Sequence, residues 1–207
     1  MENSLGRSYR LGLYEKALPA ELTWKEKLET ARDSGFDHME ISVDETDEKL
    51  ARLDWTRDQK HELVSLMEET GVPIRSMCLS GHRKYPLGSP NEATRTRGLE
   101  IMDRAVTLAA ELGIRIIQLA GYDVYYEQGT ERTRELFADG LRKAVGMAAK
   151  SGVVLGFETM ETPFMDTVEK AMRYVNLIGS PYLGLYPDIG NLQNAALLYG
   201  KPAAEDL

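Results

Sequence analysis

The chain has 207 residues and a formal net charge of −8, a balance that disfavours binding to the phosphate backbone of nucleic acids. Hydrophobic residues make up 43% of the chain, enough for a buried core, but no window approaches the ~20 apolar residues that a membrane span needs. With a single cysteine, Cys78, and no visible signal peptide, the sequence predicts a cytoplasmic protein without disulfides.

Short apolar runs alternate with longer amphipathic runs along the chain. The expected elements are, in order, a strand at 10–14, a helix at 24–34, a strand at 38–43, a helix at 54–70, a strand at 74–80, a helix at 91–112, a strand at 114–120, a helix at 131–150, a strand at 153–160, a helix at 165–178, a strand at 182–188 and a short helix or loop at 191–199. Glycines close most of these helices. Strands that alternate with helices pair in parallel, with the helices as crossover connections.

Two α/β architectures are compatible with this alternation of strands and helices. An open doubly wound sheet can stop at six strands, but no glycine-rich phosphate loop follows the first expected strand, where the sequence is GLYEKALP. A closed barrel needs eight units. The missing loop weakens the doubly wound alternative without excluding it. No linker or low-complexity tract divides the chain.

The active site of a barrel lies where its strands end and the following loops begin. The polar residues expected there are Glu15, Asp44, Ser80, His82, Gln118, Tyr122, Glu158 and Asp188. Glu158 lies within the apolar run VVLGFETM, and a buried carboxylate is costly unless it is paired or binds a metal ion. We expect Glu158 to be a metal ligand or a general base, the alternative being an ion pair with a lysine or arginine.

Asp188 lies in the segment LYPDIGN, where Pro187 and Gly190 favour a tight turn that projects the carboxylate from the strand end. The same position suits a helix N-cap, for which aspartate is common, so both roles stay open. Oxygen ligands from successive strands suit a hard divalent cation such as Mg²⁺ or Mn²⁺.

The loop after the third expected strand, LSGHRKYP, contains one of only three histidines. This histidine, His82, is a candidate substrate contact. Arg83 and Lys84 beside it could attract a phosphate, although loop cations are more often merely solvated. Cys78 is expected to be a small apolar side chain in a buried strand.

Five segments carry a family resemblance. They are GLYEKALP (12–19), MEISVDETDEKLARLDW (39–55), SMCLSGHRKYPLGS (76–89), RIIQLAGYDVYY (115–126) and LYPDIGN (185–191). Together, from about Leu11 to Asn191, the chain resembles the L-ribulose-5-phosphate 3-epimerases, also called L-xylulose-5-phosphate 3-epimerases. These enzymes belong to the xylose-isomerase-like barrel superfamily.

The resemblance implies an α/β (β/α)8 TIM barrel, of which residues 1–207 supply about the first six βα units as a single partial domain. It also implies that this barrel binds a divalent metal ion (Mn, Mg, Co or Zn) through Glu, Asp, His and Glu side chains. Glu158 matches the first ligand and Asp188 the second, and Asn191 falls where related epimerases often place a substrate-contacting side chain. The implied substrate is a small sugar phosphate, and the implied reaction interconverts L-ribulose 5-phosphate and L-xylulose 5-phosphate in L-ascorbate or related pentose catabolism. Glu158 would be one of two glutamates that exchange protons at C3.

The resemblance also implies ligands from a seventh and an eighth strand. No histidine follows His82, and the only glutamate after the sixth expected strand is Glu205, in the terminal tail. We therefore expect a fragment or truncated barrel, whose exposed sheet edges would favour association, including a homo-oligomer. The alternatives are an inactive truncated barrel, or an isomerase or epimerase of an unphosphorylated ketose. The net charge and the few histidines disfavour an apurinic-site nuclease of the same superfamily.

Overall fold

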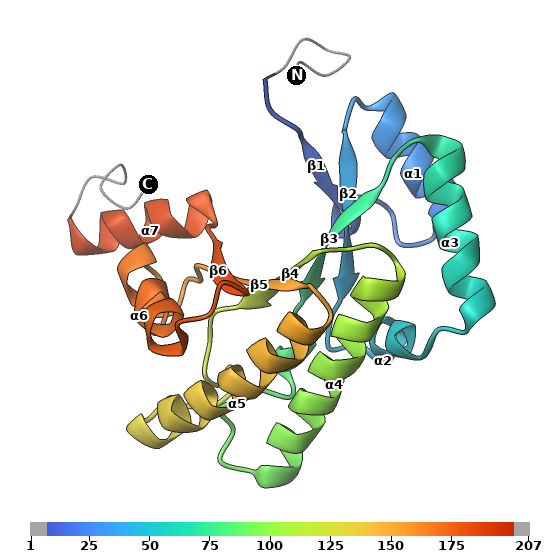
Figure 1. Ribbon diagram of the computed structural model, residues 1–207. Helices are drawn as coiled ribbons and strands as arrows, with labels where there is room; N and C mark the ends of the chain where they lie inside the picture. Colours follow the sequence, from blue (N-terminus) through green and yellow to red (C-terminus); the bar gives the residue numbers. More distant parts are fainter. Residues whose placement is uncertain (1–7, 201–207) are drawn as a thin grey trace.

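Six strands form one parallel sheet in the computed structural model, which describes residues 8–200 (Figure 1). The strands are β1 (Gly12–Tyr14), β2 (His38–Val43), β3 (Ile74–Leu79), β4 (Ile116–Ala120), β5 (Val154–Glu158) and β6 (Leu183–Tyr186). Their order in the sheet is their order in the sequence, and every neighbouring pair is parallel. This arrangement confirms the six predicted barrel units.

Helices connect successive strands, as parallel pairing requires. They are α1 (Trp24–Asp33), α2 (Asp47–Leu50), α3 (Arg57–Thr70), α4 (Glu92–Glu111), α5 (Glu131–Lys150), α6 (Val168–Ile178) and α7 (Ile189–Tyr199), with short 3-10 helices η1 (Glu15–Ala17), η2 (Ala51–Asp54) and η3 (Gly81–Arg83). Figure 1 shows α3, α4 and α5 on the outer side of the curved sheet. None of the described helices is long and apolar enough to cross a membrane.

Capping residues decide where the helices begin. α3 begins at Arg57 rather than at residue 54, because the Thr56 side chain accepts a backbone N–H of the first turn. In the same way Thr167 caps α6, which begins at Val168 rather than at the predicted 165. The predicted glycine stops are confirmed after these two helices, where Gly71 and Gly179 adopt left-handed φ angles of 72° and 64°.

One continuous apolar cluster lies between the sheet and the helices. Its largest fully buried side chains include Leu28, Ile41, Met77, Ile101, Ile117 and Phe157. Inside the curve of the sheet, the Tyr186 hydroxyl of β6 donates a hydrogen bond of 2.9 Å to Glu40 Oε2 of β2. Because a side chain of the sixth strand reaches one of the second, the sheet is curled into most of a barrel.

Candidate active site

A cavity of about 510 Å³ lies inside the curled sheet and reaches the carboxyl ends of the strands. All six strands or the loops after them contribute to its wall: Tyr14, Lys16, Glu40, Cys78, Ser80, Arg83, Gln118, Ala120, Glu158, Met160, Glu161, Tyr186, Pro187, Asp188 and Asn191. A larger groove of about 720 Å³ runs between α5 and α6 on the outer surface. Strand-end residues line only the first of these two, which makes it the candidate active site.

Glu158 is the last residue of β5 and is half-buried at the cavity wall. Burial raises the pKa of its carboxyl to about 7, and the negative charges of Asp188, Glu40 and Glu161 act in the same direction. A carboxyl with this pKa exchanges a proton readily near neutral pH, as a general base or acid must. No lysine or arginine forms an ion pair with Glu158 in the described structure, so the alternative considered from the sequence is not observed.

Asp188 follows β6 and joins it to α7. Its Oδ1 accepts the backbone N–H of Asn191 at 2.8 Å, so it is the N-cap of α7, which begins ahead of the predicted residue 191. The Thr159 hydroxyl accepts the backbone N–H of Asp188 at 3.0 Å, and the Asn191 amide donates to the Thr159 carbonyl at 2.9 Å. These bonds hold the loops after β5 and β6 together. Capping engages one carboxylate oxygen, which leaves the second for a ligand.

Glu40 is a cavity residue that the sequence analysis did not select. Its Oε2 accepts hydrogen bonds from the Ser76 hydroxyl at 2.7 Å and the Tyr186 hydroxyl at 2.9 Å. The signal that singled out Glu158 was also present here, because Glu40 interrupts the apolar strand HMEISV. Glu161, in the loop after β5, also lines the cavity.

His82 lies in η3 and does not line the cavity. Its side chain is buried, and Nε2 lies 3.0 Å from the backbone oxygen of Gly98. Burial lowers the pKa of His82 to about 4, so its ring is neutral at neutral pH. The neighbouring Arg83 does line the cavity, and its guanidinium stacks 4.7 Å from the ring centre of Tyr125. The structure thus brings Glu158, Asp188 and Asn191 together and leaves His82 outside.

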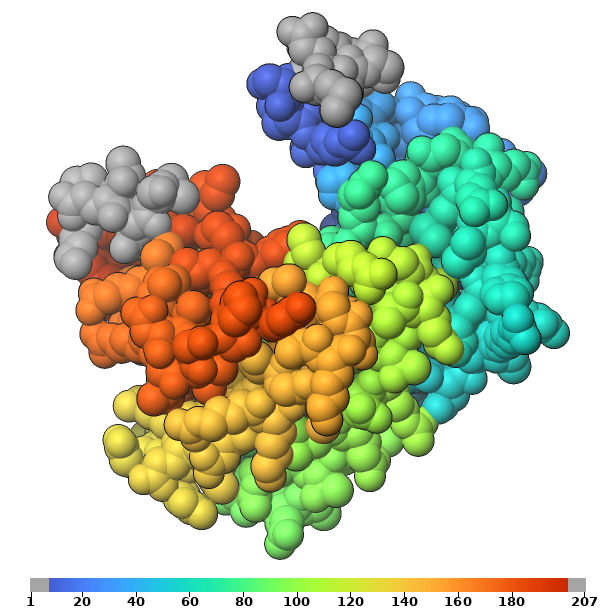
Figure 2. Space-filling model, viewed as in Figure 1, coloured from blue at the N-terminus to red at the C-terminus, as the bar shows by residue number. Residues whose placement is uncertain are grey.

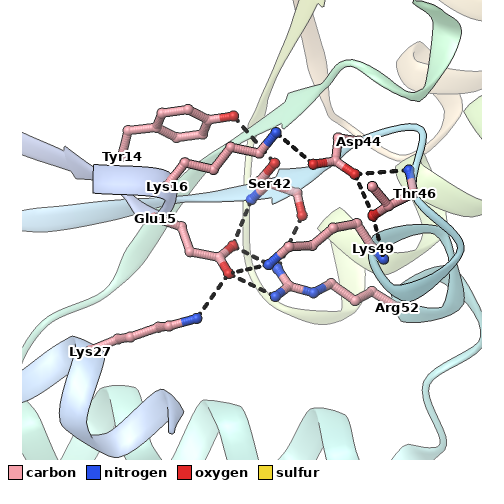
Figure 3. A network of polar contacts seen from close by, with 9 residues as sticks. All are labelled: Tyr14, Glu15, Lys16, Lys27, Ser42, Asp44, Thr46, Lys49 and Arg52. Atoms are coloured by element: carbon pink, nitrogen blue, oxygen red, sulfur yellow. Dashed lines mark hydrogen bonds and ion pairs between the residues drawn. The ribbon is translucent and has the colours of Figure 1, made fainter. Parts of the chain in front are cut away.

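Glu15, at the end of β1, is engaged in a buried ion network (Figure 3). Its carboxylate accepts two hydrogen bonds from Arg52, at 2.6 and 2.7 Å, and lies 2.8 Å from Lys49 and 3.2 Å from Lys27. The backbone N–H of Ser42 donates to it at 2.9 Å. Burial opposes ionisation, but these partners, Arg52 foremost, lower the pKa of Glu15 to about 2. Its role is to fix β1, α1, β2 and η2 against one another.

Asp44, the other strand-end carboxylate of this region, is also paired. Its Oδ2 lies 2.5 Å from Lys16 Nζ, and its Oδ1 accepts the hydroxyl and the backbone N–H of Thr46 (Figure 3). Lys16 itself lines the cavity. The ion pair therefore holds one cation at the edge of the candidate site.

The chain is similar to known proteins of one family. A model of the xylose isomerase-like TIM barrel family matches residues 28–206. The chain belongs to this family. It is 53% identical over 188 residues to "L-ribulose-5-phosphate 3-epimerase UlaE" of Salmonella heidelberg (strain SL476), and equally to that of Salmonella dublin. The match covers 91% of this chain and 66% of each relative, so the chain spans just under two thirds of their length.

Solved structures of the same fold are more distant in sequence. D-psicose 3-epimerase from Clostridium cellulolyticum H10, with D-tagatose, aligns with a TM-score of 0.78 at 16% identity, over 89% of this chain and 65% of that one. A xylose isomerase-like TIM barrel protein from Mycobacterium smegmatis in complex with magnesium aligns with a TM-score of 0.66 at 18% identity, over 89% and 66% of the two chains. Identities this low establish the fold alone.

A metal site in this family member would use the two predicted ligands. Glu158 ends β5 and Asp188 follows the neighbouring strand β6. Both line the cavity, and the charge of Asp188 raises the pKa of Glu158. A cation between them would remove that repulsion. Within residues 8–200, however, no group of three or more His, Cys, Asp or Glu side chains is arranged to hold a metal ion. The described chain therefore fits part of a metal site, and Glu205 lies outside the described residues.

Proposed function

We propose that the cavity around Glu158 catalyses epimerisation at C3 of a ketopentose 5-phosphate, interconverting L-ribulose 5-phosphate and L-xylulose 5-phosphate. The observation that carries the proposal is the pairing of Glu158 with Asp188 at the ends of β5 and β6, inside a cavity lined by all six strands. The 53% identity to relatives named L-ribulose-5-phosphate 3-epimerase supports this substrate class.

The chemistry requires removal of a proton from C3, next to the ketone at C2. Glu158 is the proposed base, because its carboxylate ends β5 at the cavity wall and forms no ion pair with a lysine or arginine in the described structure. Glu158 and Asp188 would hold a divalent cation (Mn, Mg, Co or Zn), which when bound polarises the ketone. Asn191, which Asp188 and Thr159 hold at the cavity wall, would orient the sugar hydroxyls. Inversion also needs a proton donor on the opposite face of C3, across the cavity from Glu158.

Two cations favour a phosphorylated substrate over a neutral ketose. Lys16 and Arg83 line the cavity, and the guanidinium of Arg83 lies over the ring of Tyr125. Cations at the wall would attract the 5-phosphate of the sugar. Phosphorylated sugars are cytoplasmic metabolites, and we propose that compartment and a place in L-ascorbate or related pentose catabolism. We propose no nucleic-acid or membrane partner, in keeping with the acidic composition.

Exchange of the C3 proton with solvent tests the role of Glu158 as a base. One base suffices for this exchange, whereas complete epimerisation needs a second group. The chain is incubated with L-ribulose 5-phosphate and Mn²⁺ in D₂O, and deuterium at C3 is measured by mass spectrometry. We expect exchange by the wild type and a loss of roughly 10²–10⁴-fold in Glu158→Gln. Glu135→Gln, on the exposed face of α5, is the matched control and should exchange like the wild type.

Absence of exchange in the folded wild type, or equal exchange in Glu158→Gln, would overturn the proposed role. Repeating the measurement with L-ribulose, which lacks the phosphate, decides between the two substrate classes. Faster exchange of L-ribulose than of its 5-phosphate would favour an epimerase of unphosphorylated ketoses.

A further inference from the structure

Gln118 lies on β4, deeper in the cavity than Glu158. Across the pair of strands β4 and β5, Ala120 is the partner of Glu158, and Gln118 is the partner of Gly156. Alternate residues of a strand point to the same face, so Gln118 and Ala120 share the inner face of the sheet, and both line the cavity. At about 3.3 Å per residue, Gln118 lies roughly 6–7 Å further from the strand ends than Ala120 and Glu158 do.

The side chain of Gln118 is a buried amide that the fold does not engage. It is only 6% exposed, although it lines the cavity. Other polar side chains of the cavity wall have partners: the Tyr186 hydroxyl donates to Glu40, and the Asn191 amide donates to the Thr159 carbonyl. No residue in the described part of the chain forms a hydrogen bond with the Gln118 amide. A buried amide needs a hydrogen-bond partner, and here a molecule inside the cavity must supply it.

The cavity leaves room for a ligand beside this amide. Its partner on β5 is Gly156, which in turn pairs with Gly184 of β6, so two successive positions carry no side chain. A Cβ added at Gly184 would meet no atom of the described residues within 4 Å. Figure 2 shows the surface hollowed between the blue and the red parts of the chain. A small molecule can therefore extend past Glu158 to the level of Gln118.

The order of functional groups along the cavity matches the order of atoms in a ketopentose 5-phosphate. The cations Lys16 and Arg83 belong to η1 and η3, which follow β1 and β3, so they lie beyond the strand ends. Glu158 lies at a strand end, and Gln118 lies deeper. In the sugar, the phosphate on C5, the reacting carbon C3 and the hydroxyl on C1 follow one another in the same order. An amide both donates and accepts hydrogen bonds, as a hydroxyl does.

We propose that Gln118 forms a hydrogen bond with the C1 hydroxyl of the ketose and so determines specificity for sugars that carry this hydroxyl. The identity of the hydroxyl rests on the proposed function, whereas the lack of a partner for the Gln118 amide is a feature of the described structure itself. With the phosphate at the cations and C1 at Gln118, both ends of the sugar are held. The C3 proton is then confined to positions near Glu158.

Sugars with and without the C1 hydroxyl test this contact. Deuterium exchange at C3 is measured with L-ribulose 5-phosphate and with 1-deoxy-L-ribulose 5-phosphate, for the wild type and for Gln118→Met, which has a similar size but no amide. The wild type should exchange the 1-deoxy sugar at least about tenfold more slowly, because the amide then stays unpaired. Gln118→Met should lose about tenfold with L-ribulose 5-phosphate and should exchange the 1-deoxy sugar at least as fast as the wild type does.

Two controls exclude a purely structural role of Gln118. The thermal midpoint of Gln118→Met should equal or exceed that of the wild type, because the substitution removes a buried amide that has no partner in the fold. A lower midpoint would show that the amide serves packing, and equal losses of exchange with both sugars would refute the contact. Gln128→Met, on an exposed residue in the loop after β4, is the matched control and should exchange both sugars like the wild type.

Binding measurements separate this inference from the proposed function. The dissociation constants of both sugars are measured by isothermal titration calorimetry for the wild type and Gln118→Met. A preference of the wild type for L-ribulose 5-phosphate that Gln118→Met abolishes would support the contact even without exchange, and the absence of exchange would then refute the proposed function alone. Equal binding of the two sugars by the wild type, or no binding of either, would overturn the assignment of Gln118.

Discussion

Replacement of Glu15 by glutamine is expected to destabilise the fold strongly, because it removes the carboxylate that pairs with two buried cations, Lys27 and Arg52, and with the partly buried Lys49. Glu15 is 2% exposed, and Lys27 and Arg52 are 5% and 6% exposed. The network lowers the pKa of Glu15 from 4.5 to about 2, and at about 1.4 kcal/mol per pH unit this corresponds to about 3 kcal/mol. Breaking a buried ion pair by removing one partner typically costs about 3–5 kcal/mol, in agreement with this estimate.

The assay is urea unfolding of the wild type and Glu15→Gln followed by circular dichroism. In thermal unfolding the same loss would lower the midpoint by about 6–12 °C for a chain of this size. Glu69→Gln is the matched control, because Glu69 pairs with Lys25 at a similar distance of 2.6 Å but on the exposed surface. The control should unfold at the wild-type midpoint. A loss below about 1 kcal/mol in Glu15→Gln would refute the reasoning.

The difference between wild type and Glu15→Gln should also depend on pH. The folded pKa of about 2 lies below the ordinary value of 4.5, so the unfolded state binds the proton more readily. The stability that Glu15 contributes is therefore complete above about pH 4.5 and is lost as the pH falls toward 2. The two proteins should converge in stability as the pH is lowered from 7 to 3. A constant difference over this range would show that the effect is not ionic.

Three further substitutions test individual positions. Asp188→Asn should keep the wild-type unfolding midpoint, because asparagine caps a helix as well as aspartate does. Asp188→Ala should lose about 1 kcal/mol of unfolding free energy. Equal midpoints for Asp188→Ala and the wild type would contradict a role for the cap. Leu28→Ala should cost about 2–5 kcal/mol in urea unfolding, because Leu28 is fully buried; a cost below 1 kcal/mol would contradict tight packing there. Gly121→Ala should reduce C3 exchange, because the Cβ of the new alanine would lie 2.6 Å from the Glu158 backbone oxygen and displace β5. Exchange at the wild-type rate would contradict this displacement.

Much of the fold could be predicted because its signals are local. Alternation of strands and helices requires parallel pairing, and the barrel implied by the family resemblance places the six strands in chain order. The juxtaposition of Glu158, Asp188 and Asn191 follows too, because parallel strands end at the same edge of the sheet. Helix starts were less accurate, because a capping threonine such as Thr167 decides the boundary within one turn.

The remaining features depend on contacts between residues far apart in the sequence. His82 lies outside the cavity because its ring reaches the backbone of Gly98, a partner that no local pattern identifies. Glu15 was among the residues expected at the active site. Its pairing with Arg52 was not predicted, because the two residues are 37 positions apart in the sequence. Glu40 could have been predicted from the sequence, because it interrupts an apolar strand in the same way as Glu158.

The sequential order of the strands has a consequence for synthesis of the chain. Each strand pairs with the one made just before it, so every unit can pack as it emerges from the ribosome, without waiting for later residues. The bond from Tyr186 to Glu40 is an exception, because it joins positions 146 residues apart. It can form only after β6 has been made, and it then ties the sixth strand to the second across the cavity, so the cavity wall is completed late in synthesis.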